Sequence, residues 1–321
     1  MKVVVTGGAG YVGSTLVPTL LAAGHQVRVF DSLLFGGDSL LGVWSEPGFR
    51  FTRGDVRDQD ALTEVVRGAE AVVHLAAIVG DPACAREPGQ ARAVNLDASI
   101  ALIDQAQRAG VSRFIFASTC SNYGRMAEAN GLVDEDSPLA PVSLYAETKV
   151  AIERALFDRR GGGMAVTALR FATVFGVSPR MRYDLTVNEF TRSMMLDRHL
   201  VVFGEQFWRP YVHVRDVARA VGLVLAAPVD RVERDVFNVG DTDQNFQKQQ
   251  LVDLIRPYAP DAVVEYVHRD EDPRDYRVSF EKIRRRLGFR ISIPVADGIA
   301  EVARLVAAGV TPEVGVTGVP A

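Results

Sequence analysis

The feature that most constrains this chain is a regular alternation of short β-branched runs with longer stretches of helical periodicity. The expected strands are 2–5, 27–30, 71–75, 114–117 and 166–169, and the expected helices are 10–23, 59–66, 90–109 and 144–159. Apolar strands without a polar face are buried on both sides, and strands that alternate with helices form a parallel sheet. The sequence therefore predicts an α/β fold built on a doubly wound parallel sheet.

The alternation fades in the second half of the chain, where loops containing proline and arginine separate isolated helices. No linker, low-complexity tract or internal repeat divides the 321 residues, so one body with two lobes is expected. We predict a nucleotide-binding domain over 1–175, to which 209–240 returns through strands near 212–214 and 236–239. A smaller, mixed α/β substrate-binding lobe with a loose C-terminal tail would take up most of 176–321.

Composition and charge argue against several other classes of protein. The 36 basic and 40 acidic residues give a formal net charge of −4, which offers no general attraction for nucleic acid. The first residues lack the features of a secretory signal, and no run approaches the roughly 18 apolar residues of a membrane helix, so a cytoplasmic protein is expected. Cys84 and Cys120 form no CxxC pair and the five histidines are scattered, so no metal site is expected.

Four glycines, Gly7, Gly8, Gly10 and Gly13, lie between the first strand and the first helix in the segment TGGAGYVG. Residues without a side chain let the backbone approach a pyrophosphate at a helix N-terminus, as in Rossmann domains, although a plain tight turn has the same composition. Asp31 follows the second strand, where a carboxylate accepts hydrogen bonds from the adenosine ribose and repels a 2′-phosphate. These residues predict NAD as the cofactor. The alternative role for Asp31 is that of an acid in a helix cap or a turn.

Tyr145 and Lys149 are four residues apart in the helical segment LYAETKVAIE, so their side chains lie on one face. A free phenol titrates near about pH 10, and a neighbouring ammonium favours the phenolate. We therefore expect Lys149 to lower the pKa of Tyr145 and to make it an acid or base near neutral pH. The alternative, a tyrosine–lysine pair on a solvated helix face, is disfavoured by the nucleotide loop and Asp31 upstream.

These motifs together resemble those of the extended short-chain dehydrogenases, in particular the NAD-dependent nucleotide-sugar epimerases and dehydratases, over residues 1–305. GDVRD resembles that family's adenine contacts, HLAA the strand end that lines its cofactor, and STCSNYG its serine- and threonine-rich strand end. The resemblance implies a catalytic trio in which Tyr145 and Thr119 bind the reacting sugar oxygen and Lys149 also holds the nicotinamide ribose. The implied cofactor contacts are Gly7, Gly10, Tyr11, Val12, Gly13, Asp31, Asp55, Val56, Leu75, Ala76, Ala77, Asn95, Tyr145 and Lys149.

The resemblance also implies a set of substrate contacts. RPYVHVRD matches a family segment whose arginine, here Arg209, binds the substrate pyrophosphate, and a planar guanidinium suits that task. Counting back from Lys282 places Arg269 on a second phosphate arginine, with Arg274 as a close competitor, and Asn188 matches an amide near the nucleotide base. For each arginine a plain surface charge is the alternative. The implied substrate residues are Ser121, Thr173, Asn188, Arg209, Arg269 and Arg274.

The chain departs from the 4,6-dehydratases of this group directly after Thr119. Those enzymes have an Asp–Glu pair there, which supplies the acid and the base for eliminating water, whereas this chain has Cys120 and Ser121. Thr173 likewise replaces a common asparagine. We therefore expect epimerisation of a nucleotide sugar, at C4 through a transient 4-keto sugar, instead of dehydration.

Two other functions stay open at this point. A nucleotide 4-keto-sugar reductase would use the same residues with exchangeable NADH or NADPH, whereas a non-catalytic dinucleotide sensor would use only the cofactor site. The resemblance further implies a homodimer formed through the helices expected at 90–109 and 144–159.

Overall fold

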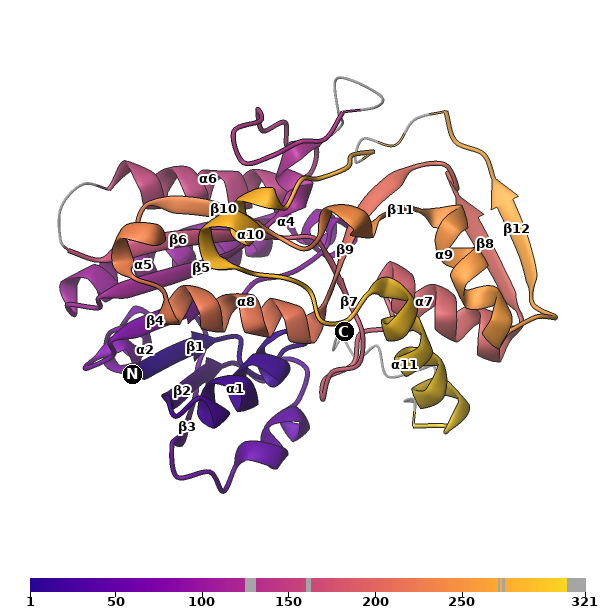
Figure 1. The fold of residues 1–321 in the computed structure, drawn as a ribbon. Helices are drawn as coiled ribbons and strands as arrows, with labels where there is room; N and C mark the ends of the chain where they lie inside the picture. Colours follow the sequence, from indigo (N-terminus) through magenta and orange to yellow (C-terminus); the bar gives the residue numbers. More distant parts are fainter. Residues whose placement is uncertain (125–130, 160–162, 271, 273–274, 311–321) are drawn as a thin grey trace.

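A seven-stranded parallel sheet forms the larger lobe, with the strand order β10-β6-β5-β4-β1-β2-β3 (Figure 1). Its strands are β1 (Lys2–Thr6), β2 (Gln26–Asp31), β3 (Phe49–Arg53), β4 (Ala71–His74), β5 (Arg113–Thr119), β6 (Ala165–Phe171) and β10 (Asp235–Val239). The order reverses between β1 and β4, so the loops at the carboxyl ends of these strands part and leave room for a ligand. The computed structural model describes residues 1–124, 131–159, 163–270, 272 and 275–310.

Helices cover both faces of this sheet, because successive residues of its strands point to opposite sides. The covering helices are α1 (Gly13–Ala22), α2 (Gln59–Val66), α5 (Ala98–Arg108), α6 (Leu144–Asp158) and α8 (Val214–Ala226). In β1, Val3 and Val5 pack with Leu16 of α1 in one buried cluster, whereas Val4 packs with Leu102 of α5 in another. Thus α1 and α8 cover one face, and α2, α5 and α6 cover the other (Figure 1).

The smaller lobe contains two short sheets and three helices around its own core. A three-stranded sheet joins β7 (Thr173–Phe175), β9 (Trp208–His213) and β11 (Asn245–Gln247), and a two-stranded sheet joins β8 (His199–Phe203) and β12 (Val263–Val267). Its helices are α7 (Thr186–Arg192), α9 (Lys248–Ile255) and α11 (Val295–Ala307). Phe190, Leu251 and Ile299 from these helices meet in one buried cluster, together with Met194 from the segment that follows α7.

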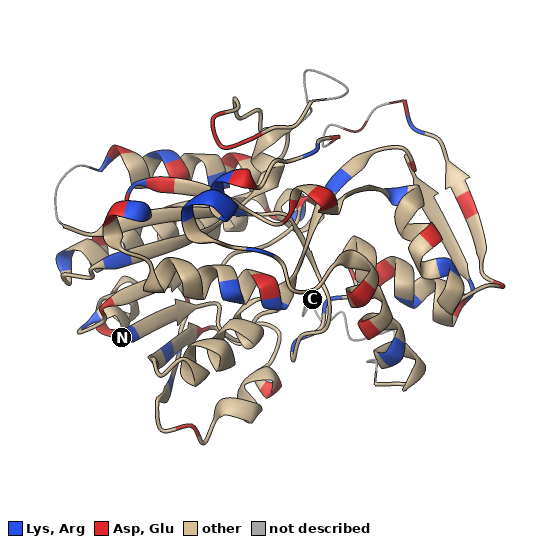
Figure 2. Cartoon of the chain, in the orientation of Figure 1, with Lys and Arg blue, Asp and Glu red and all other residues tan. Residues whose placement is uncertain are grey.

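Shorter helical elements complete the described chain. They are α3 (Asp81–Arg86), α4 (Pro88–Arg92) and α10 (Glu281–Leu287), the 3₁₀ turns Asp38–Val43, Cys120–Tyr123, Val229–Arg231, Thr242–Gln244 and Arg256–Tyr258, and the π-helical segments Ala93–Asp97 and Ser193–Asp197. Figure 2 shows basic and acidic residues interspersed over both lobes. None of the helices in the described residues is both long and apolar enough to cross a bilayer.

The doubly wound parallel sheet predicted from the alternation is confirmed, and the helices expected at 59–66 and 144–159 match α2 and α6. One predicted strand was placed wrongly. Of the run near 212–214, Val212 and His213 belong to β9 and Val214 begins α8. Because β9 pairs with β7 and β11 and not with the main sheet, α8 and β10 are the parts of 209–240 that return to the larger lobe. An apolar run has the same composition in either sheet, so its partners do not follow from the sequence. Of the expected tail, residues 311–321 lie outside the described residues.

Candidate active site

The glycine-rich loop after β1 permits a close approach of three backbone segments. Gly7 has a φ of +74°, and a Cβ at that position would lie 2.7 Å from the backbone nitrogen of Ala76. A Cβ on Gly13 would lie 2.3 Å from the carbonyl oxygen of Gly7. Both positions therefore require glycine, and their lack of side chains lets the loop pack against the segment after β4 on one side and the first turn of α1 on the other.

The start of α1 presents backbone donors beside this loop. Among the described residues, the amides of Tyr11, Val12 and Gly13 donate to no protein acceptor. A Cβ on Gly10 would meet only the carbonyl oxygen of Gly7, at 3.2 Å, so there is space next to these amides. Unpaired amides at a helix start bind anions, because the helix dipole also favours negative charge there. The arrangement fits the diphosphate of NAD at the positions that the sequence predicted.

Asp31, at the end of β2, is fixed by the backbone around it. Its carboxylate oxygens accept hydrogen bonds from the amides of Ala9, at 2.9 Å, and Leu33, at 2.8 Å. A carboxylate has about four acceptor sites, so lone pairs remain for ribose hydroxyls. The geometry is therefore compatible with the predicted contact to the adenosine ribose.

Other predicted cofactor residues lie at the ends of β3 and β4. Asp55 accepts hydrogen bonds from Arg57, whose Nη2 lies 2.6 Å away, and these bonds lower the pKa of Asp55. Val56 is buried in the core, so a cofactor contact at this position would use its backbone atoms. Leu75 continues β4, where its amide donates to the Thr6 carbonyl at 3.1 Å, and Ala76 and Ala77 follow it.

Asn95 supports the segment that follows β4. It lies in the π-helical segment Ala93–Asp97, between α4 and α5, and π-helical turns are frequent at functional sites. The Asn95 amide donates to the Ile78 carbonyl at 2.9 Å and accepts from the Ile78 amide at 2.7 Å. The side chain therefore fixes the backbone just beyond Ala77, which is a positioning role.

The predicted catalytic trio comes from α6 and the end of β5. Ser143 caps α6 at its start, and Tyr145 and Lys149 follow on the same face. The Nζ of Lys149 lies 5.7 Å from the centre of the Tyr145 ring and donates to the carbonyl of Ala117 in β5 at 2.8 Å. Thr119 ends that strand and is buried. The structure thus brings the phenol and the ammonium together beside the strand end that carries the threonine.

Burial dominates the titration of these groups. Desolvation raises the pKa of Tyr145 above its usual value, and the largest opposing influence is the positive charge of Arg182, in the loop between β7 and α7. Desolvation also lowers the pKa of Lys149 to about 8. The prediction that Lys149 makes the pKa of Tyr145 lower than usual was wrong in direction, because desolvation of the buried phenol outweighs the influence of positive charge. No local pattern around Arg182 pointed to its influence on Tyr145.

A buried polar network behind the trio was also missed from the sequence. Glu153, one helical turn beyond the catalytic lysine, pairs with Arg170 of β6 at 2.7 Å, and both side chains are almost fully buried. The Glu153 carboxylate also accepts from the Ser118 hydroxyl and from the Asn122 amide, the latter at 3.0 Å. The network fixes α6 against β5 and β6. A glutamate at this helical spacing signals a shared face, but its partner on a distant strand gives no local signal.

The positions after Thr119 carry neutral groups. Cys120 is buried, its thiol donates to the Arg170 carbonyl at 3.3 Å, and burial raises its pKa well above the usual value, so the thiol stays protonated. The Ser121 hydroxyl lies 3.4 Å from the hydroxyl of Tyr276. Thr173 is half-buried at the start of β7. Cys120 is thus part of the core, whereas Ser121 and Thr173 are half-buried residues.

The predicted substrate residues of the smaller lobe differ in their surroundings. Arg209 is 7% exposed and pairs with Asp272 at 2.7 Å. Arg269 is exposed, with its guanidinium 5.4 Å from an aromatic ring centre. Arg274 lies outside the described residues. Asn188 is fully buried, and its amide is bonded at 2.9 Å to two backbone groups of the loop between β7 and α7, which supports a positioning role and not direct contact with a base.

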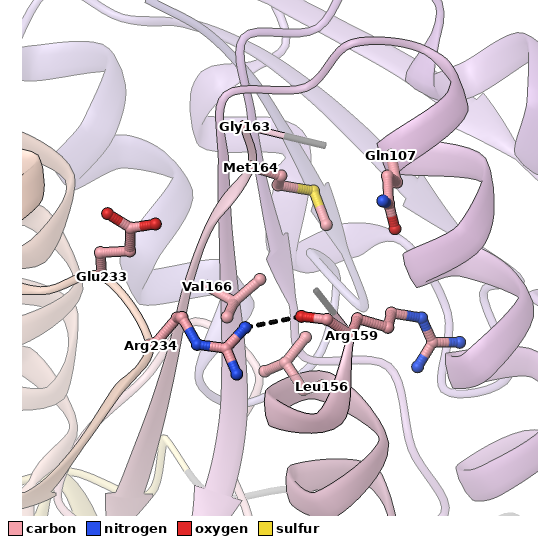
Figure 3. A pocket seen from close by; sticks show the side chains of 8 residues that line it. All are labelled: Gln107, Leu156, Arg159, Gly163, Met164, Val166, Glu233 and Arg234. Atoms are coloured by element: carbon pink, nitrogen blue, oxygen red, sulfur yellow. Dashed lines mark hydrogen bonds between the residues drawn. The ribbon is translucent and has the colours of Figure 1, made fainter. Parts of the chain in front are cut away.

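A small cavity of about 110 Å³ lies beside the amino-terminal ends of β6 and β10 (Figure 3). Arg159, just after α6, and Met164, just before β6, help to line it, and the Arg234 side chain donates to the Arg159 carbonyl at 2.6 Å. Because it adjoins the amino-terminal end of β6, this cavity is remote from the catalytic trio.

Comparison with known proteins identifies the family. The model of the NAD dependent epimerase/dehydratase family matches residues 3–240. The chain belongs to this family. A dTDP-glucose 4,6-dehydratase from Streptomyces niveus is 32% identical over 94% of this chain and 91% of that protein. A UDP-glucose 4-epimerase from Corynebacterium glutamicum is 29% identical over 90% of each chain. The structure of MoeE5 in complex with UDP-glucuronic acid and NAD is similar with a TM-score of 0.83 and 27% identity, over 96% of this chain and 100% of that one.

As a member of the NAD dependent epimerase/dehydratase family, the protein is an NAD-dependent enzyme of the nucleotide-sugar epimerase and dehydratase type. The predicted resemblance and the predicted cofactor are both confirmed, since the family is NAD-dependent and MoeE5 was solved with NAD. The alternative of a non-catalytic sensor is thereby set aside. Because relatives of both reaction types match along nearly the whole chain, the distinction between epimerase and dehydratase depends on individual site residues.

Proposed function

We propose that this enzyme is a nucleotide-sugar 4-epimerase, which oxidises the C4 hydroxyl to a ketone and then reduces it from the opposite face. The observation that carries this proposal is the neutral pair after Thr119. Cys120 is a buried, protonated thiol, and Ser121 contributes a hydroxyl. Elimination of water needs one group that gives a proton and another that removes one, and neither position supplies a carboxylate. The residues for oxidation at C4 are present, but the pair for dehydration is not.

The described side chains would have separate tasks in this reaction. Tyr145 removes the proton of the C4 hydroxyl and returns it in the second half of the cycle, while Thr119 hydrogen-bonds the same oxygen. Lys149, which is positive below its pKa of about 8, binds the nicotinamide ribose. Bound NAD would supply the hydride acceptor and donor for the two halves of the cycle, so no external oxidant would be required.

Arg182 is proposed as a positive group that supports the phenolate. Its guanidinium binds Asp184 through contacts of 3.0 and 2.5 Å, and its charge is the largest influence that lowers the pKa of Tyr145. Because burial acts in the other direction, loss of a proton from Tyr145 depends on the positive charges around it. The smaller lobe thus contributes to the acid–base chemistry as well as to substrate binding.

The smaller lobe is also proposed to hold the nucleotide diphosphate. Asp272 holds the guanidinium of Arg209 in one orientation, and an oriented planar guanidinium binds phosphate oxygens in pairs. Arg269 is proposed as a second phosphate ligand, and Ser121 and Thr173 as contacts to the sugar. MoeE5 is described with UDP-glucuronic acid, so nucleotide-linked uronic acids belong among the substrates to be tested.

We also propose a cytoplasmic homodimer that forms through α5 and α6, which lie side by side on one face of the main sheet. Cys84 and Cys120 are both free and buried, as is usual in a reducing compartment. Light scattering of the purified enzyme tests the assembly, and a purely monomeric protein would refute the dimer.

The experiment begins with the purified enzyme, which is denatured so that any released cofactor can be identified by mass spectrometry. The native enzyme is then incubated with uridine, thymidine, guanosine and cytidine diphosphate sugars, including a uronic acid, and each mixture is followed by NMR. We expect retained NAD and the appearance of a C4 epimer without added cofactor. A 4-keto-6-deoxy product would identify a dehydratase, and consumption of NADH only with a keto sugar would identify a reductase. Either result would refute the epimerase.

A further inference from the structure

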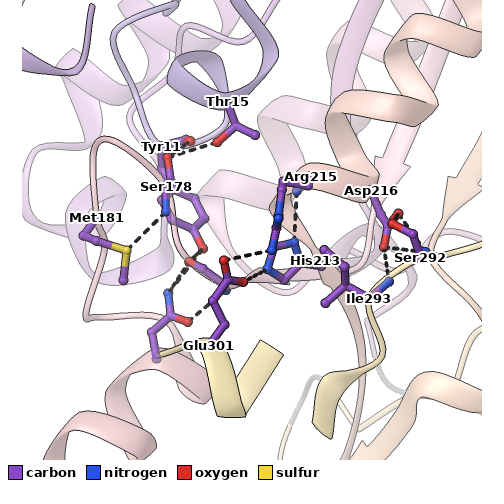
Figure 4. Close-up of polar contacts among 12 residues, drawn as sticks. Tyr11, Thr15, Ser178, Met181, His213, Arg215, Asp216, Ser292, Ile293 and Glu301 are labelled. Carbon is purple, nitrogen blue, oxygen red and sulfur yellow. Dashed lines mark hydrogen bonds and ion pairs between the residues drawn. The ribbon is translucent and has the colours of Figure 1, made fainter. Parts of the chain in front are cut away.

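A loop of the smaller lobe is fastened onto the glycine-rich loop of the larger lobe. We name residues 176–182 the latch loop. The Tyr11 hydroxyl donates to the Gly176 carbonyl at 2.6 Å, and the Ser178 hydroxyl donates to the Tyr11 carbonyl at 2.7 Å. Ser178 also contacts the hydroxyl of Ser14 at 2.9 Å. Its contact with the hydroxyl of Thr15, at 3.2 Å, is drawn in Figure 4. All these contacts join the latch loop to the start of α1, where NAD phosphates are expected.

The latch loop is held firmly by its own lobe as well. Gly176 has a φ of +103°, and a Cβ there would lie 2.1 Å from Nε2 of His213, which is bonded to Glu301 of α11 at 2.8 Å (Figure 4). The Asn188 amide accepts from the Gly176 amide and donates to the Arg182 carbonyl, both at 2.9 Å. The loop is therefore a fixed bridge between the lobes, and the side chains on it have defined positions.

Arg180 extends from this bridge toward the adenosine side of the cofactor site. Its backbone amide donates to the Ser14 hydroxyl at 3.3 Å, and its guanidinium carbon lies 4.1 Å from the centre of the Phe35 ring. Phe35 is 54% exposed and lies in the segment after Asp31, the predicted ribose contact. Arg180 thus spans from the phosphate-binding start of α1 to the segment that follows β2.

The charge of Arg180 is not matched by a close acid. Within the described part of the chain, no carboxylate lies within ion-pair distance of its guanidinium, although the charges of Asp184 and Asp31 act on it from farther away. Partial burial lowers its pKa, as does repulsion by Arg182. A partly desolvated guanidinium without a carboxylate partner is well suited to bind an anion by charge-assisted hydrogen bonds.

We propose that Arg180 is a cofactor-retention residue: it donates to a phosphate oxygen of NAD while Phe35 orients its guanidinium by stacking. The inference depends on NAD as the cofactor and not on which sugar carbon reacts. It gives the latch loop a purpose, since an enzyme that oxidises and re-reduces one substrate molecule must keep its cofactor throughout the cycle. The bridge would slow release of NAD by adding a ligand from the opposite lobe.

The test uses the full-length enzyme freed of NAD, in wild-type form and as Arg180→Gln, Arg180→Lys and Arg67→Gln. Affinities for NAD, ADP-ribose and adenosine are measured by calorimetry without sugar, and NAD dissociation by stopped flow. Arg180→Gln should weaken NAD and ADP-ribose about 10- to 100-fold, as loss of a charge-assisted hydrogen bond does, with adenosine unchanged. Arg180→Lys keeps the charge but not the planar stack, so an intermediate effect is expected. Arg67→Gln removes an equal charge from a side chain that is 70% exposed beyond α2, and should change nothing.

Unchanged NAD affinity in Arg180→Gln would overturn the proposal. An equal loss of adenosine affinity would also overturn it, because the residue would then act by packing and not through phosphate. Thermal unfolding of the NAD-free variants separates a loss of binding from a loss of folding. The variant Phe35→Leu repeats the binding test with the guanidinium of Arg180 intact but without the aromatic ring on which it stacks. An enzyme that holds NAD through Arg180 but never interconverts C4 epimers would refute the proposed function and leave this inference standing.

Discussion

Replacing Glu153 with glutamine tests the buried ion pair behind the catalytic helix. The side chains of Glu153 and Arg170 are 4% and 5% exposed and lie 2.7 Å apart. Glutamine keeps the shape and one acceptor for Asn122, but it removes the negative charge and turns an amide donor toward the guanidinium. Loss of one partner from a buried pair costs about 3–5 kcal/mol of unfolding free energy, because the remaining charge is uncompensated.

The surroundings of Arg170 explain why this cost should not be smaller. Burial alone would lower the pKa of Arg170, and the bonds from Glu153 more than reverse that effect and raise it above the usual value. Within the described residues, the other side chain that binds this guanidinium is Tyr123, whose hydroxyl accepts at 2.9 Å. A neutral hydroxyl is a weak substitute for a carboxylate, so the variant leaves a buried positive charge with neutral partners.

The assay is urea unfolding of the NAD-free enzyme, because NAD bound to the native state alone would add to its stability. Asp104→Asn is the matched control, since it removes a charge from a pair with Arg159 at 2.7 Å whose side chains are 41% and 24% exposed. That control should cost less than about 1 kcal/mol. An equal cost for Glu153→Gln and the control would refute the reasoning. Combining Glu153→Leu with Arg170→Met should recover part of the loss, because both charges are then removed.

Four further predictions concern the site. Tyr145→Phe should abolish turnover while the enzyme still retains NAD, as measured by mass spectrometry of the released cofactor; loss of NAD would contradict the acid–base role. Folding lowers the pKa of Lys149 from 10.5 to about 8, so the unfolded chain binds more protons between these values, and stability should rise over that pH window by about 3 kcal/mol relative to Lys149→Met. Urea midpoints that follow the same pH profile in both proteins would exclude this. Arg182→Gln should shift the acid limb of the kcat profile to higher pH, since a charge that lowers the pKa of Tyr145 is lost; an unshifted limb would exclude that influence. Cys120→Ala should leave turnover unchanged, because the thiol is buried and protonated, whereas an inactive but folded variant would show a chemical role.

The fold was predictable because hydrophobic periodicity is a local property of the chain. Val3, Val4 and Val5 are all apolar, and this pattern alone indicates a strand buried on both faces. The partners of a strand are not local, which is why β9 was assigned to the wrong sheet. The same limit applies to Glu153, whose position on the face of Lys149 follows from helical spacing, whereas its pairing with Arg170 requires β6 to lie beside α6.

The candidate site was predictable to the extent that motifs fix positions along the chain. Gly7, Gly13 and Asp31 have the backbone contacts that their places in the pattern demand. The environment of Tyr145 was not predictable, because the desolvation of its phenol and the nearby charge of Arg182 come from segments distant in sequence. A motif therefore identifies a reactive group, but its pKa is set by what the tertiary fold places around it.

The buried side chain of Asn188 links the latch loop to the environment of Tyr145. Its motif suggested a base contact, yet its amide holds both ends of the latch loop and also donates to the Tyr11 hydroxyl at 3.2 Å. That loop carries Arg180 toward the cofactor site and ends at Arg182, whose charge acts on Tyr145. One buried amide thus fixes the backbone on which both guanidinium groups depend. If Arg180 retains NAD as proposed, cofactor retention and the acid–base strength of the tyrosine are coupled through a single loop, and a change in how the lobes fit together would alter both.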